Sequence, residues 1–154
     1  MEADRAGTNL LGFRLFLAAD GLAFASLVFA LINSAGRAAV DAPRLNDAGL
    51  AASGTLLASA FLWRAGHRAS GCLGFVASSV VVGYAWMLVD HRSGVGAYPT
   101  SPLVLGAWLL AHLFATSVAL LRRVRAAGTP LLDELVLFVP IASALAHITL
   151  RALR

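Results

Sequence analysis

The stretch LFLAADGLAFASLVFALI, residues 15–32, decides the fold class. It is apolar almost throughout and has nearly the length of a helix that crosses the hydrocarbon core of a membrane, which takes about 20 residues. Its one carboxylate, Asp20, is the exception. An acid inside a membrane is energetically expensive and by default marks a functional site. The stretch therefore predicts a transmembrane helix and raises the question of what Asp20 contacts.

The composition of the whole chain points to the same class of protein. Of 154 residues, 59% are hydrophobic and 13% are charged, whereas globular domains carry about 25% charged residues. The net charge is +4, but the arginines are scattered among short loops and ends, a pattern that does not favour nucleic-acid binding. Arg122, Arg123 and Arg125 form a tight cluster after an apolar run, and we interpret them as a membrane-edge anchor.

Five apolar segments follow one another along the chain, and none alternates with the period of two that is typical of a membrane barrel. Backbone groups in lipid must bond internally, so the segments are predicted to be helices. Pro102 and Pro130 are placed as helix starts. The expected fold is all-α, a single transmembrane domain over residues 1–154, with spans at about 10–33, 45–63, 69–89, 102–121 and 131–150.

Arginine counts on the two sides of such a bundle predict its orientation. The side that holds the N-terminus would carry seven arginines and the other side five. This favours a cytoplasmic N-terminus and an outside C-terminus. The membrane is expected to be a bacterial inner membrane. The lone Cys72 cannot form an intramolecular disulfide and is interpreted as a small buried residue.

Small residues recur on the faces of two segments. Ala51, Thr55 and Ser59 are spaced by four residues, and Gly21 and Ala25 share a helix face. Such faces let helix backbones approach closely in lipid. They indicate either tight packing within the bundle or a docking face for a partner subunit, and the pattern alone leaves both open.

Few residues could carry chemistry. Asp20 is either functional or a hydrogen-bonded contact between helices. His112 and His147 invite a bis-histidine haem, but His112 is expected about 15 Å into the membrane and His147 near the outer end of its span, so no haem is predicted. Asp133 and Glu134 open the fifth segment, where acids favour the helix dipole. The sequence has no P-loop, paired-cysteine or nucleophile-elbow motif.

These features together resemble subunit III of haem–copper oxidases. The stretch GFRLFLAADGLAFASLVFALI is similar to a span of that family in which an acid precedes a Phe-Ala run, and Asp20 stands at the position of the acid. In the next span, Leu45 and Asn46 followed by Ser53 match a Leu-Asn pair with serines seven residues on. Val89 and Asp90 stand where the family has a Tyr-Glu pair.

The last two spans match the family in part. His112 stands at the second histidine of a Gly-x-His-x-x-His pattern, with Leu109 in place of the first. Asp133 matches the acid of a Trp-His-Phe-x-Asp pattern, but Thr129 and Pro130 replace its Trp and His. The individual motifs are short, and it is their order over nearly the whole chain that carries the resemblance.

The resemblance implies an accessory subunit without haem or copper of its own, both groups being expected in oxidase subunits I and II. It also implies bound phospholipid, and a role for Asp20 as a proton-responsive or structural acid. Two alternatives stay open. One is an accessory subunit of a nitric oxide reductase-type complex. The other is a small oligomeric transporter, in which Asp20 and His112 would line a polar path.

Overall fold

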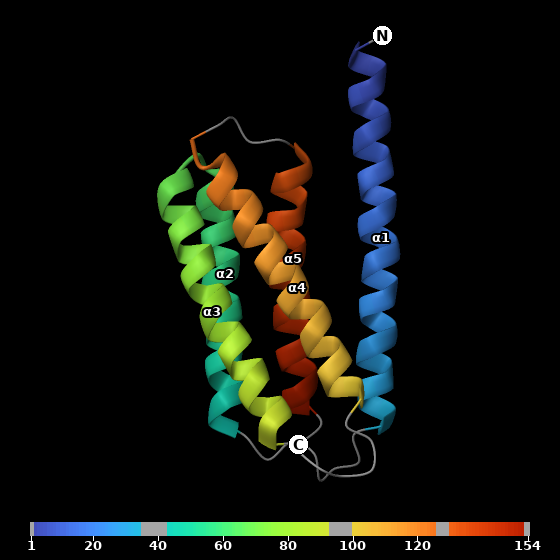
Figure 1. Cartoon of the computed structure of the whole chain (residues 1–154), viewed down its shortest axis with the longest axis vertical. Coiled ribbons are helices and arrows are strands. Elements are labelled where there is room, and N and C mark those ends of the chain that lie inside the picture. Colours follow the sequence, from blue (N-terminus) through green and yellow to red (C-terminus); the bar gives the residue numbers. More distant parts are fainter. Residues whose placement is uncertain (1, 35–42, 93–99, 126–129, 153–154) are drawn as a thin grey trace.

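A computed structural model of the chain is helical in all its regular elements over the part that it describes, residues 2–34, 43–92, 100–125 and 130–152. Over these residues the chain forms five helices. Successive helices alternate in direction, so that the first helix begins and the last one ends at opposite ends of the molecule (Figure 1). The helices are α1 (Glu2–Ser34), α2 (Pro43–Arg64), α3 (Arg68–Arg92), α4 (Thr100–Arg123) and α5 (Pro130–Ala152).

Four of the helices are long and apolar enough to cross a membrane, over Asn9–Ala30, Arg68–Met87, Val104–Arg123 and Pro130–Ala152. The exception is α2, whose segment was expected to be the second span. It packs against both α3 and α5. Its serines, Ser53 and Ser59, are buried against α5 and α3, so they lower its apolar content without facing lipid.

The helices extend beyond the apolar segments that predict them. The first begins at Glu2 and the third ends at Arg92, because polar residues at a segment's ends continue the backbone hydrogen bonding without being apolar. The turn between α2 and α3 is short. Gly66 adopts a positive φ of 93° there, a conformation that glycine reaches at little cost.

Close packing between α2 and α3 depends on glycine. A β-carbon added at Gly71 would lie 2.6 Å from the backbone nitrogen of Trp63. Ser59 meets Gly74, and Thr55 Oγ1 lies 2.7 Å from Ser78 Oγ. Two members of the α2 small-residue pattern, Thr55 and Ser59, thus contact α3 within the bundle.

Helix α1 stands at the edge of the molecule and contacts α4 and α5. Few of its residues are buried, with Phe24 the most enclosed at 6% exposure. Gly21 faces the ring of Phe138 on α5, whereas Ala25 is exposed. The core lies among α2–α5, where Trp63, Phe75 and Trp86 are the largest buried side chains.

Candidate functional site

The carboxylate of Asp20 points from α1 toward α4. Trp108 Nε1 donates a hydrogen bond of 3.0 Å to Asp20 Oδ1, and His112 Nε2 lies 2.9 Å from Asp20 Oδ2. The side chains of His112 and Asp20 are 20% and 14% exposed. We call Asp20, Trp108 and His112 the acid cluster.

Helical spacing places the two partners of Asp20 together. Trp108 and His112 are four residues apart and so share one face of α4. Their rings lie 4.0 Å apart between centroids, at 30°. His112 Nδ1 is 2.8 Å from the carbonyl oxygen of Trp108. This contact locks the ring, with its second nitrogen toward α1.

The positions of hydrogen atoms around His112 follow from its neighbours. A carbonyl oxygen only accepts, so Nδ1 must carry a proton to bond with Trp108. The other ring nitrogen, Nε2, lies 2.9 Å from Asp20 Oδ2. This close approach lacks hydrogen-bond alignment, since Oδ2 has no hydrogen bond among the described residues.

Aromatic rings surround the acid cluster. Phe24 lies 5.0 Å from Trp108 between centroids, and Phe138 meets the same ring edge-on at 6.1 Å. Apolar surroundings strengthen electrostatic contacts and raise the cost of a missing one. The cluster therefore links α1 to α4.

Two further polar contacts involve the acids at the start of α5. Glu134 Oε1 accepts bonds of 2.8 and 2.7 Å from the Arg14 guanidinium on α1. Asp133 Oδ1 accepts a 3.0 Å hydrogen bond from Trp63 Nε1 at the end of α2. Both acids were interpreted as helix-start residues, and the structure adds specific partners on other helices.

Ser53 and His147 belong to a separate buried group between α2 and α5. Ser53 Oγ lies 2.7 Å from Ser143 Oγ and donates to Gly49 O. His147 Nδ1 is 2.9 Å from Ser143 O, and Trp86 meets the His147 ring edge-on at 5.6 Å. His112 and His147 thus have different neighbours.

The remaining candidate residues are less informative. Arg122 and Arg123 are exposed in the last turn of α4 and Arg125 is exposed in the turn beyond it. The side chains of Asn46 and Asp90 lie outside the described residues, as does Thr129. In the described part of the chain, no group of three His, Cys, Asp or Glu residues is placed to hold a metal ion.

Sequence reasoning missed Trp108 as the donor to Asp20 and Arg14 as the partner of Glu134. A signal existed for Trp108, because it stands four residues before His112 on the same helix face. Arg14 lies in an apolar segment, which by itself calls for a nearby acid, but several acids could have filled that role.

Comparisons with family models, with curated protein sequences and with solved structures find no match to this chain.

Proposed function

We propose that this chain is a non-catalytic accessory subunit of a respiratory haem–copper oxidase. The observation that carries the proposal is the contact between Asp20 and His112. Both residues stand at motif positions of the subunit III resemblance, and they are distant in sequence. In this proposal haem and copper belong to subunits I and II. This chain packs against those subunits, stabilises them and binds phospholipid.

The proposal includes five membrane crossings, a cytoplasmic N-terminus and an outside C-terminus. Helix α2 has 22 residues, or about 33 Å at 1.5 Å per residue, which is enough for a hydrocarbon core of about 30 Å. Its place against α3 and α5 offsets its lower apolar content. The opposite positions of the termini agree with an odd number of crossings.

Helix α1 supplies the surface for a catalytic partner. Ala19, Ala23, Ser26 and Ala30 recur at helical spacing and are exposed. A face of small residues allows a neighbouring transmembrane helix to come close, and packing of this kind drives helix association in lipid. Such a partner would cover a helix that this chain leaves largely open.

Asp20 has two roles in this proposal. Through Trp108 and His112 it holds α1 against α4, which sets the position of the partner-facing surface. Through its carboxyl group, which lies beside His112, it responds to proton supply within the membrane. The first role depends on hydrogen bonding and the second on titration, so substitution can separate them.

Isolation of the tagged chain in mild detergent tests the proposal. The expected result is co-isolation with oxidase subunits I and II and with the visible spectrum of their haems. Co-isolation with the catalytic subunit of a nitric oxide reductase would move the chain to that complex. A ring of copies without other subunits would favour the transporter alternative and contradict the accessory role.

Substitution of Asp20 by Asn tests the proton-responsive role in the assembled complex. Asn keeps the size and an acceptor for Trp108 but cannot titrate. We expect normal assembly with a changed pH profile of turnover, or faster inactivation during turnover, between about pH 6 and 9, because a carboxylic acid can exchange protons and an amide cannot. Asp47→Asn is the matched control, since Asp47 is 53% exposed and pairs with Arg151 at a chain end. Identical profiles for wild type and Asp20→Asn would reduce Asp20 to a structural contact.

A further inference from the structure

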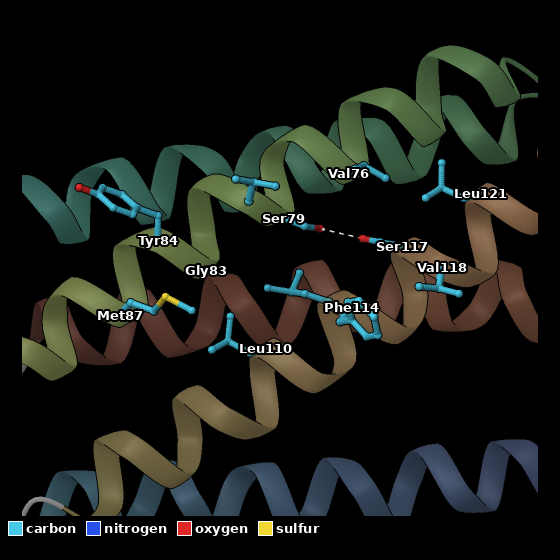
Figure 2. A pocket seen from close by; sticks show the side chains of 12 residues that line it. Val76, Ser79, Gly83, Tyr84, Met87, Leu110, Phe114, Ser117, Val118 and Leu121 are labelled. Carbon is cyan, nitrogen blue, oxygen red and sulfur yellow. Dashed lines mark hydrogen bonds between the residues drawn. The ribbon is translucent and has the colours of Figure 1, made fainter.

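A groove runs along the outer surface between α3 and α4, away from the acid cluster. Its volume is about 490 Å³. Figure 2 shows α3 on one side and α4 on the other, with Ser79 and Ser117 facing each other across the floor. Apart from these two hydroxyls and that of Tyr84, the lining side chains are apolar.

The groove is open and lacks a covering element within the described chain. Tyr84, Met87 and Phe114 along it are exposed by 62%, 61% and 73%. In a membrane-spanning bundle such apolar surface faces lipid, and the distinctive feature here is that the surface is recessed into a groove that can hold an occupant. In a membrane, two kinds of occupant fit it, a helix of another chain or the acyl chain of a lipid.

The length of the groove distinguishes between these two candidate occupants. Its α4 side runs from Leu110 to Leu121, which is about 16 Å at 1.5 Å per residue. A transmembrane partner helix makes contact along a hydrocarbon core of about 30 Å. Half of that depth is the reach of one lipid leaflet, so the groove fits an acyl chain better than a helix.

Charge at one end indicates the headgroup. Leu121 lines the groove, and the exposed Arg122, Arg123 and Arg125 follow directly. Basic clusters at a membrane edge bind anionic lipid headgroups. A lipid with its acyl chain in the groove would thus have its headgroup near these three arginines. Their guanidinium groups can form hydrogen bonds with the lipid phosphate.

We propose that the α3–α4 groove and the arginine cluster form a binding site for one anionic phospholipid, with an acyl chain in the groove and the phosphate at the arginines. The inference rests on the membrane setting of the proposed function and specifies its phospholipid, but it does not depend on the catalytic partner. The site therefore has to be present in the isolated chain.

Native mass spectrometry of the full chain in mild detergent tests the site, with phosphatidylglycerol and phosphatidylcholine of equal chain length as probes. We expect one retained phosphatidylglycerol and weaker retention of phosphatidylcholine. Ser117→Phe fills the groove floor and is expected to abolish retention. Ala115→Phe is its control, because Ala115 is exposed on the same helix and is absent from the lining.

Joint replacement of Arg122, Arg123 and Arg125 by Gln tests the headgroup. We expect retention of phosphatidylglycerol to fall by at least about tenfold, to the level of phosphatidylcholine. Arg64→Gln is the control, because Arg64 is exposed and is the last residue of α2, which ends on the same side of the bundle as α4 (Figure 1). Unchanged lipid retention in either the Ser117→Phe or the triple variant overturns the proposal. A wild-type dimer that becomes monomeric in the Ser117→Phe variant also overturns it. Should Ser117→Phe not fold, the triple variant and the headgroup comparison decide alone. Loss of co-isolation with an oxidase would leave these lipid measurements unaffected.

Discussion

The ring of His147 on α5 lies against the backbone of Gly49 on α2, with no space between them for a β-carbon. His147 is 1% exposed and is held by its contact with Ser143 O on its own helix. It therefore cannot swing away without breaking that contact. The approach of α2 to α5 at this level depends on glycine.

Gly49→Ala is expected to destabilise the protein by about 1–3 kcal/mol, because overpacking a well-packed core has this cost. The measurement is denaturation of the detergent-solubilised chain, followed by helical circular dichroism. Gly54→Ala is the matched control on the same helix, since nothing lies within 4 Å of its added β-carbon. There the change removes only the helix penalty of glycine and should stabilise by about 0.5–1 kcal/mol.

A second substitution sharpens the Gly49 prediction. His147→Ala removes the ring that the new methyl group would meet, so Gly49→Ala should cost less in the His147→Ala background than in the wild type. Equal effects of Gly49→Ala and Gly54→Ala in the wild type would mean that α2 and α5 do not meet as described.

The buried pair Ser53–Ser143 is predicted to couple α2 to α5. Its oxygens are 2.7 Å apart, and both residues are 0% exposed. A double-mutant cycle with Ser53→Ala and Ser143→Ala should give a coupling energy of about 0.6 kcal/mol and at most about 1.7, the range for hydrogen bonds between transmembrane helices. A cycle on Ser26, exposed and bonded within its own helix, should show no coupling to Ser143. A coupling of zero for Ser53 would contradict the contact.

Asp20→Leu is expected to be more damaging than Asp20→Asn. Leucine leaves Trp108 Nε1 without its acceptor, which costs about 1–3 kcal/mol for a buried donor. Asparagine retains an acceptor, and the loss should be near the average membrane hydrogen bond, about 0.6 kcal/mol. The same denaturation measurement applies. Ala23→Leu, at an exposed position of α1, controls for added side-chain volume, and equal stability of both Asp20 variants would argue that Trp108 does not depend on Asp20.

The number of membrane crossings has a direct test. If α2 crosses together with the four more apolar helices, reporters fused before Glu2 and after Arg154 will report opposite sides. We expect a reporter that is active outside the cytoplasm to work at the C-terminus. If α2 does not cross, both termini lie on one side, and the same pair of fusions detects this.

Run length and apolar content were sufficient to predict the helices, because hydrocarbon leaves a backbone few other options. The expected segment 45–63 lies within α2, which nonetheless falls short of the apolar character of the other four. Its shortfall is interpretable only once its neighbours are known, since burial against α3 and α5 is a property of packing and not of the segment.

Contacts between helices were harder to predict than the helices themselves. Asp20 and His112 were each singled out, but their pairing depends on how α1 and α4 are rotated about their axes, which apolar segments leave nearly free. Helical spacing could have indicated Trp108 from His112. Gly49 offered no such signal, because a glycine in a helix does not reveal which side chain occupies the space beside it.

The short turn between α2 and α3 bears on how the chain enters the membrane during synthesis. Only Ala65, Gly66 and His67 separate the two helices, and the turn is closed by backbone bonds such as that from His67 N to Leu62 O. The low apolar content of α2 disfavours its partition into lipid as a single helix, whereas a preformed α2–α3 hairpin already pairs Thr55 with Ser78 and Ser59 with Gly74. In the five-crossing arrangement that we propose, the two helices would then insert as a hairpin and not strictly one at a time.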